Sequence, residues 1–167
     1  MSYSEGYNTP TSSSSFINGL NVANNDLNPE RAKVWDFSIQ GLIEHTKIDY
    51  QVSVFRLSIK DKLTHISSIA NGTTYNYFAN TGSQRNQGLE TSIGYLSKNR
   101  YSFLNIIRPF PTGSYYDFIY VDFKTLTEGQ LKVYDHKTVV GVPRNKYSLG
   151  LDVENKIGLY LNNTLNY

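Results

Sequence analysis

The stretch from residue 33 to residue 45 alternates between apolar and polar side chains more regularly than any other part of the chain. One face carries Trp35, Phe37, Ile39, Gly41 and Ile43. The opposite face carries Asp36, Ser38, Gln40 and Glu44, with Val34 and Leu42 as exceptions. A period of two residues is that of a β-strand, and this stretch is longer than the roughly 9–11 residues with which a tilted strand crosses a bilayer. The pattern predicts a β-protein with strands long enough to span a membrane.

The same alternation returns in residues 48–54, 89–96, 147–153 and 157–161. The apolar faces of residues 35–43, 48–54, 147–153 and 157–161 contain no Lys, Arg, Asp or Glu. A lysine or arginine on a lipid face at the bilayer midplane costs roughly 2–4 kcal/mol, so charge-free faces suit lipid. A buried sandwich face would also exclude charge, so the pattern supports β structure more strongly than a membrane location.

These faces give two sets of predicted positions. The residues predicted to face lipid are Trp35, Phe37, Ile39, Ile43, Tyr50, Val52, Val54, Leu89, Ile93, Tyr147, Leu149, Leu151, Val153, Leu159 and Leu161. The residues predicted to face a wet lumen are Asp36, Ser38, Gln40, Glu44, Asp49, Gln51, Glu90, Ser92, Asp152 and Asn162.

Two stretches leave alternatives open. After Val54 the apolar residues change face, which indicates either a β-bulge or a strand that has already left the membrane. Residues 72–96 read as one very long strand that starts in water and ends in an apolar layer. A hairpin within the polar run 81–87 is the other interpretation.

The connections between the predicted strands alternate in length. Short ones lie near His45, Lys98 and Asn155, and long ones at 9–31, 60–72 and 108–145. Asn71-Gly72 and Thr127-Glu128-Gly129 are predicted turns within the long connections. Short turns at one end and long loops at the other are typical of outer-membrane barrels, whose short turns lie in the periplasm.

About seven strands are predicted in total. The one that starts at Arg100 is not expected to continue as a fully paired central strand, because Pro109 and Pro111 lack amide hydrogens. An open sheet of seven strands leaves two unpaired edges, and in lipid each exposed backbone group costs several kcal/mol. Partner strands from outside the chain are therefore expected.

Composition argues against several other classes of protein. The net charge of +2 indicates no nucleic-acid partner, and the absence of cysteine excludes disulfides and thiolate metal sites. A mean hydropathy of −0.43 excludes a helical membrane protein but not a barrel, in which half of each strand faces water. His45, His65 and His136 lack metal-ligand spacing, and no nucleophile or base pattern accompanies the carboxylates. We expect no enzyme and no cofactor.

Four short motifs, in the family's order, resemble segments of TonB-dependent outer-membrane receptors. They are Tyr3-Ser4-Glu5-Gly6-Tyr7 with Thr9-Pro10, Leu27-Asn28-Pro29-Glu30, Tyr77-Phe78-Ala79-Asn80-Thr81-Gly82 with Gln87-Gly88-Leu89-Glu90, and Gly141-Val142-Pro143-Arg144-Asn145. The tract from Arg108 to Phe118 is most similar to receptors from Bacteroidetes-type bacteria. Together the motifs extend over nearly the whole chain.

The resemblance implies an all-β, antiparallel transmembrane barrel of about 22 strands. Residues 1–167 would form about a third of it, without the plug domain and the last strands. It implies the cell outer membrane, with lipid around the barrel, and uptake of an iron–siderophore complex or similar nutrient powered by the TonB complex. Because no signal peptide follows Met1, the chain is expected to be a fragment.

Ligand contacts, if this segment makes any, are expected on the outer loops, because function concentrates on loops held by a rigid scaffold. The candidates are Arg85, Arg108, Tyr115 and Tyr116, since Arg and Tyr suit catecholates and other anionic chelates. The alternative from another class is a soluble β-sandwich that binds carbohydrate on its aromatic side chains.

Overall fold

The computed structural model describes residues 1–17, 22–70, 72–99, 101–127 and 130–167. These residues contain no helix with the length and apolar character needed to span a membrane. The strands are β1 (Ser2–Asn8), β2 (Phe16–Ile17), β3 (Val22–Ala23), β4 (Glu30–Ile43), β5 (Ile48–Lys60), β6 (Leu63–Ala70), β7 (Thr73–Asn80), β8 (Gly82–Tyr95), β9 (Ser97–Lys98), β10 (Leu104–Thr127), β11 (Gln130–Val133), β12 (Asn145–Asn155) and β13 (Tyr160–Asn166).

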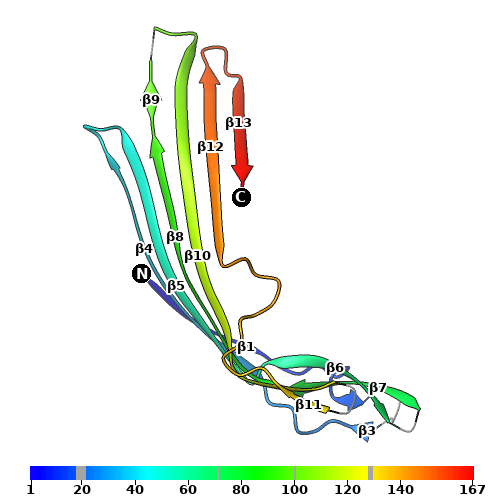
Figure 1. Ribbon diagram of the computed structural model, residues 1–167. Coiled ribbons are helices and arrows are strands. Elements are labelled where there is room, and N and C mark those ends of the chain that lie inside the picture. The colour runs from blue at the N-terminus through cyan, green and yellow to red at the C-terminus, as the bar shows by residue number, and fades with distance from the viewer. Residues whose placement is uncertain (18–21, 71, 100, 128–129) are drawn as a thin grey trace.

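Seven of these strands form one curved sheet in the order β1-β4-β5-β8-β10-β12-β13, and every neighbouring pair is antiparallel. β9 and β11 add short pairings to β10. The short turns after β4, β9 and β12 lie at one end of the sheet, and β6, β7 and β11 project from the other end (Figure 1). The prediction of about seven antiparallel strands with short and long connections at opposite ends is confirmed.

The two faces of the sheet differ in chemistry because cross-strand partners share a face. Phe37 lies opposite Val54 and Val54 opposite Leu89, whereas Gln51 lies opposite Ser92. The apolar face is defined here by Trp35, Phe37, Ile39, Ile43, Tyr50, Val52, Val54, Leu89, Ile93, Tyr147, Leu149, Leu151, Val153 and Leu161. The polar face is defined by Asp36, Ser38, Gln40, Asp49, Gln51, Glu90, Ser92, Asp152 and Asn162.

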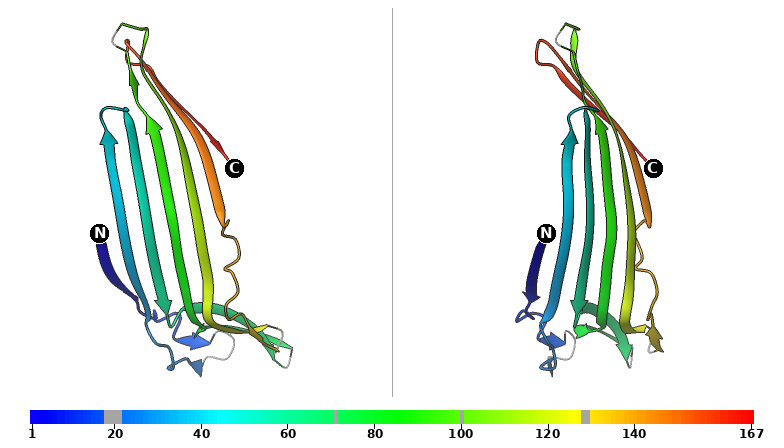
Figure 2. Two further views of the ribbon diagram at one scale, coloured as in Figure 1. Left: turned by 60° about the vertical axis from the view of Figure 1, so that its left-hand side comes forward. Right: turned by 90° about the vertical axis from the view of Figure 1, so that its left-hand side faces the viewer.

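The residues that the structure describes form no closed hydrophobic core. Trp35, Phe37 and Ile39 are 49%, 50% and 50% exposed, and Ile66 is the one buried hydrophobic residue in the described part of the chain. Both views in Figure 2 show the long strands as a single layer. The β-sandwich alternative is therefore wrong, because no second sheet covers the apolar face within the described ranges.

The stretch predicted as one strand over residues 72–96 is two consecutive strands, β7 and β8, and not a hairpin. β7 pairs with β6, whereas β8 pairs with β5 and β10. The break lies at Gly82, which has a φ of 123° and a backbone so close to β10 that a Cβ would lie 1.4 Å from the Asp122 carbonyl oxygen. Only glycine fits this conformation and this contact, so Gly82 is the point where the chain passes from the β6–β7 pair into strand β8 of the large sheet.

The long connections contain more strand than the sequence predicts. The prediction of a polar loop at residues 60–72 is wrong, because β6 occupies most of that stretch. Within the connection predicted at 108–145, β10 continues as a strand to Thr127. The first connection contains the small β2–β3 pair, and Asn24 Nδ2 donates to the Phe78 carbonyl at 2.7 Å. The predicted turn residues Asn71, Glu128 and Gly129, and the predicted strand start Arg100, lie outside the described residues.

The change of face after Val54 does not come from a bulge. β5 pairs with β4 and with β8 without a shift in register from Ile48 to Ile59. Phe55 instead points to the polar side, where its ring lies 6.2 Å from Tyr116 and 6.3 Å from Phe118. The bulge is therefore wrong, and the other interpretation, a strand that has already left the membrane, stays a prediction.

The prolines of β10 affect its two sides differently. Pro109 and Pro111 pair with Leu151 and Leu149 of β12. On the other side of β10, pairing is interrupted between Ile107 and Thr112. Ile107 pairs with β9 and Thr112 pairs with β8, and the two pairings have the same register. The prediction that β10 cannot be fully paired here is confirmed, because a proline nitrogen has no hydrogen to donate.

Candidate functional site on the polar face

An ion-pair network on the polar face joins side chains from three strands, β5, β10 and β12. Arg108 on β10 donates from Nε to Asp49 Oδ1 at 3.0 Å and from Nη2 to Asp49 Oδ2 at 2.5 Å. Its Nη1 donates to Asp152 Oδ2 on β12 at 3.1 Å. The fork of a guanidinium suits two parallel bonds to one carboxylate, so Arg108 binds Asp49 in a bidentate manner and still reaches Asp152.

The network needs a glycine on the strand between its partners. Gly94 on β8 lies opposite Asp49, and a Cβ there would lie 2.4 Å from Asp49 Oδ1 and 2.9 Å from Arg108 Nε. On the far side, Tyr160 and Asn162 of β13 donate to Asp152 Oδ1 at 2.8 and 2.6 Å. One row of side chains therefore links β5, β10, β12 and β13 near the short-turn end of the sheet.

An aromatic cluster lies farther along the polar face toward the projecting strands. It consists of Phe55, Tyr116 and Phe118, with the Tyr116 and Phe118 rings 5.5 Å apart. The Tyr116 hydroxyl donates to Glu90 Oε1 at 2.7 Å. The cluster offers apolar ring surface beside a carboxylate, in contrast to the row of charged and polar groups at the other end.

The structure places the residues predicted to face lipid or lumen as follows. All residues of the first set lie on the apolar face except Leu159, which precedes β13 in the turn after β12. All residues of the second set lie on the polar face except Glu44, which lies in the turn between β4 and β5. For these two residues the predicted strand positions are wrong. The turn after β12 is closed by Asn155, whose Oδ1 accepts the amide hydrogens of Ile157 and Leu159.

The four candidate ligand residues do not lie together, and none is on a loop. Arg85 is on β8 and the other three are on β10. Tyr116 belongs to the aromatic cluster, whereas Arg108 is in the ionic row at the short-turn end. Arg85 and Tyr115 lie on the side of the apolar face, where Arg85 Nη2 bonds Asp117 Oδ2 at 3.4 Å. The prediction of a loop position is wrong because β10 runs unbroken from Leu104 to Thr127.

Sequence reasoning missed the pairing of Arg108 and the aromatic cluster. The change of face after Val54 was the signal that could have found Phe55. Nothing in the sequence indicates that Arg108 meets Asp49, because the two are far apart in the chain and their register depends on β8 between them. No group of three or more potential metal ligands occurs among the described residues. His45 lies in a turn, and His65 packs edge-on against Phe78 at 5.3 Å.

Comparisons with known proteins bear on this arrangement. A family described as "TonB dependent receptor-like, beta-barrel" matches residues 1–167. Among solved structures, the outer membrane transporter YddB from Escherichia coli is similar, with a TM-score of 0.63 and 18% sequence identity. That similarity covers 84% of this chain and 21% of the transporter, so the chain spans about a fifth of the transporter's length. A search of curated proteins found no match.

The family match extends over every strand of the sheet, and the likeness to the transporter is one of fold. Both agree with an antiparallel sheet whose apolar face is uncovered and whose short turns all lie at one end. The chain belongs to the TonB-dependent receptor β-barrel family and is part of an outer-membrane barrel.

Proposed function

We propose that this chain forms part of the barrel wall of a receptor that imports an iron–siderophore complex or similar nutrient with energy from the TonB complex. The observation that supports the proposal best is the long apolar face, which stays exposed although Val54, Leu149 and Leu161 lie on it. A long face whose rows nearest the short turns carry no charge suits contact with lipid hydrocarbon. The family match supports a receptor that takes up a small ligand with energy from the TonB complex.

In this proposal the apolar face meets lipid and the polar face lines the lumen. The carboxylates Asp36, Asp49, Glu90, Asp152 and Glu154 outnumber the cations Lys98, Arg108 and Lys146 on the polar face of the described strands. Since Arg108 is already neutralised by two carboxylates, the polar face of the described strands offers no free guanidinium to an anionic chelate. Tyr116 in the aromatic cluster is therefore the ligand contact that we retain from the four candidates.

The orientation of the two faces can be measured with neighbouring cysteines, because the chain contains no natural cysteine. We expect Gln40→Cys and Gln51→Cys in the full-length receptor to react with a charged, membrane-impermeant thiol reagent. Ile39→Cys and Val52→Cys should react at least tenfold more slowly, because a thiol in hydrocarbon neither ionises nor meets the reagent. Mass spectrometry of the labelled protein in lipid vesicles gives the rates.

Each pair of neighbours serves as its own control, since the two positions have the same depth and opposite faces. Equal labelling of Ile39→Cys and Gln40→Cys would contradict the proposed orientation. After denaturation all four variants should react equally, which shows that each thiol is intact.

The transport function is tested with radioactive iron supplied as a ferric tris-catecholate to cells that express the full-length receptor. We expect energy-dependent uptake that disappears when TonB is deleted. Tyr116→Ala should weaken binding of the chelate about tenfold, because a stacked aromatic pair contributes about 0.5–1.5 kcal/mol beyond its buried area. Tyr116→Phe should retain most of the affinity. Uptake that persists without TonB would contradict the proposed energy source.

A further inference from the structure

The apolar face ends abruptly toward the projecting strands in rows of charged residues. The last uncharged row contains Phe37, Val54, Leu89 and Tyr115. The next three rows on the same face contain cations. In the first, Arg56 lies opposite Trp35, and in the second, Lys33 and Arg85 lie on either side of Ser58. In the third, Arg31 lies opposite Lys60. We call Arg31, Lys33, Arg56, Lys60 and Arg85 the basic band.

The carboxylates near the basic band neutralise only part of it. Lys33 Nζ lies 3.0 Å from Glu5 Oε1, and Arg85 Nη2 lies 3.4 Å from Asp117 Oδ2. Arg31, Arg56 and Lys60 have no carboxylate oxygen within 4.0 Å in the described part of the chain. All three side chains are exposed. The band therefore carries an excess of positive charge on the outer surface of the barrel wall.

The placement of Arg31 directly opposite Lys60 is unfavourable for the isolated sheet. Like charges at opposed positions of neighbouring strands destabilise the pairing. Arg31 gains a little from the ring of Tyr7, whose centroid is 5.9 Å from its Cζ, but among the described residues no carboxylate forms an ion pair with Arg31 or with Lys60. An external anion at this height would remove the repulsion.

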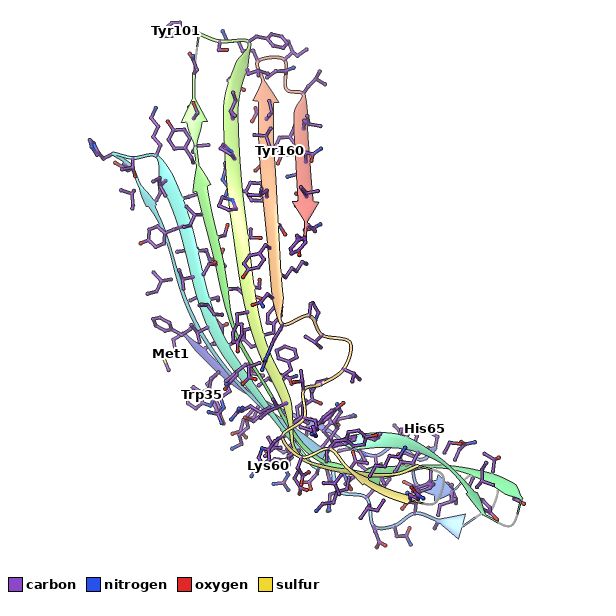
Figure 3. The ribbon with its side chains drawn as sticks, in the orientation of Figure 1. Met1, Trp35, Lys60, His65, Tyr101 and Tyr160 are labelled. Carbon is purple, nitrogen blue, oxygen red and sulfur yellow. The ribbon has the colours of Figure 1, made fainter. Side chains whose placement is uncertain are left out.

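A hollow of the apolar face adjoins the basic band. Its lining includes the apolar or aromatic side chains of Trp35, Phe37, Val54, Leu89 and Tyr115, together with Arg56 and with Asp117, the carboxylate that pairs with Arg85. Figure 3 shows Trp35 and Lys60 toward the end of the sheet from which β6, β7 and β11 project. Apolar side chains thus lie directly below guanidinium and ammonium groups, an arrangement that matches an acyl chain joined to an anionic headgroup.

We propose that the basic band binds phosphate groups of phosphorylated lipids in the outer leaflet, with the acyl chains against the neighbouring apolar hollow. Short turns mark the periplasmic end, so the basic band lies at the level of the outer leaflet. Guanidinium groups bind phosphate in a bidentate manner, and each basic residue at an anionic surface contributes about a fivefold gain in affinity. The proposal rests on the proposed lipid orientation of the apolar face.

The test uses the full-length receptor in neutral detergent, titrated with lipid A that carries two phosphates. Native mass spectrometry counts bound lipid and gives its affinity. The variant Arg31→Gln/Arg56→Gln/Lys60→Gln should bind on the order of a hundredfold more weakly, since three cations are lost. Binding by the unaltered receptor should also weaken as salt concentration rises.

A matched control removes three cations from the opposite end of the sheet. Lys47→Gln/Lys98→Gln/Lys156→Gln changes the net charge equally and should bind lipid A like the unaltered receptor. Heat-modifiable migration shows whether each variant is folded. If the triple variant of the basic band does not fold, Arg56→Gln alone should weaken binding about fivefold.

Three results would overturn the proposal. They are unchanged binding by the triple variant, equal binding of lipid A without phosphates, and equal affinity for inorganic phosphate, which would indicate a general anion site. The cysteine experiment separates this failure from that of the proposed function. If Ile39→Cys is protected and lipid A binding is unchanged in the variants, only the headgroup site is wrong.

Discussion

Val52→Arg should lower the free energy of unfolding of the full-length barrel by about 2–4 kcal/mol. Val52 lies on the apolar face of β5 between Ile39 and Thr91, two rows away from the first charged row. No carboxylate shares its row on the neighbouring strands, so an arginine there would be unpaired in hydrocarbon. Unfolding by urea in lipid vesicles, followed by heat-modifiable migration, gives the free energy.

The matched control for this change is Gln51→Arg on the polar face. Gln51 is the adjacent residue on the same strand, and Glu90 lies one row away on the neighbouring strand, so the new charge would meet water and a carboxylate. We expect a change below about 0.5 kcal/mol, as for other surface substitutions. Equal costs at the two positions would show that the apolar face does not contact lipid.

Arg108→Met should lower the free energy of unfolding by about 2 kcal/mol. The substitution removes the charged hydrogen bonds to Asp49 and Asp152 and leaves these carboxylates facing each other. Their side chains are 31% and 15% exposed, so water screens part of the repulsion and the cost stays below that of a fully buried broken pair.

A triple variant separates lost charge pairing from lost packing. Arg108→Met/Asp49→Asn/Asp152→Asn carries no ionised group in the row, and we expect it to recover at least half of the stability lost in Arg108→Met. Removing all members of an ion pair is often nearly neutral, whereas removing one is not. A triple variant less stable than Arg108→Met would mean that the carboxylates act independently of Arg108. Urea unfolding under the same conditions is the measurement.

Much of the sheet could be predicted because its strands are regular. In β4 and β12 the apolar and polar residues alternate with few exceptions, and both strands agree with prediction to within a few residues. Local alternation depends only on the pleat of the strand, so it is visible without knowing the neighbours. The prolines of β10 were equally informative, because a missing amide hydrogen limits pairing in any fold.

The outer half of the molecule could not be predicted in the same way. There apolar and polar residues no longer alternate regularly, so β6 was predicted as a loop and the end of β10 as a connection. Leu159 and Glu44 were misplaced because their alternation continues into turns closed by local hydrogen bonds.

The sequence by itself determined that this is a β-protein of long two-faced strands with short and long connections at opposite ends. It did so because side-chain alternation and turn residues are local properties. Only the tertiary structure decided which charges meet, such as Arg108 with Asp49 and Asp152, and that Arg31 stands opposite Lys60. These contacts depend on the register between strands distant in the chain, and a shift of one residue would move every side chain to the other face.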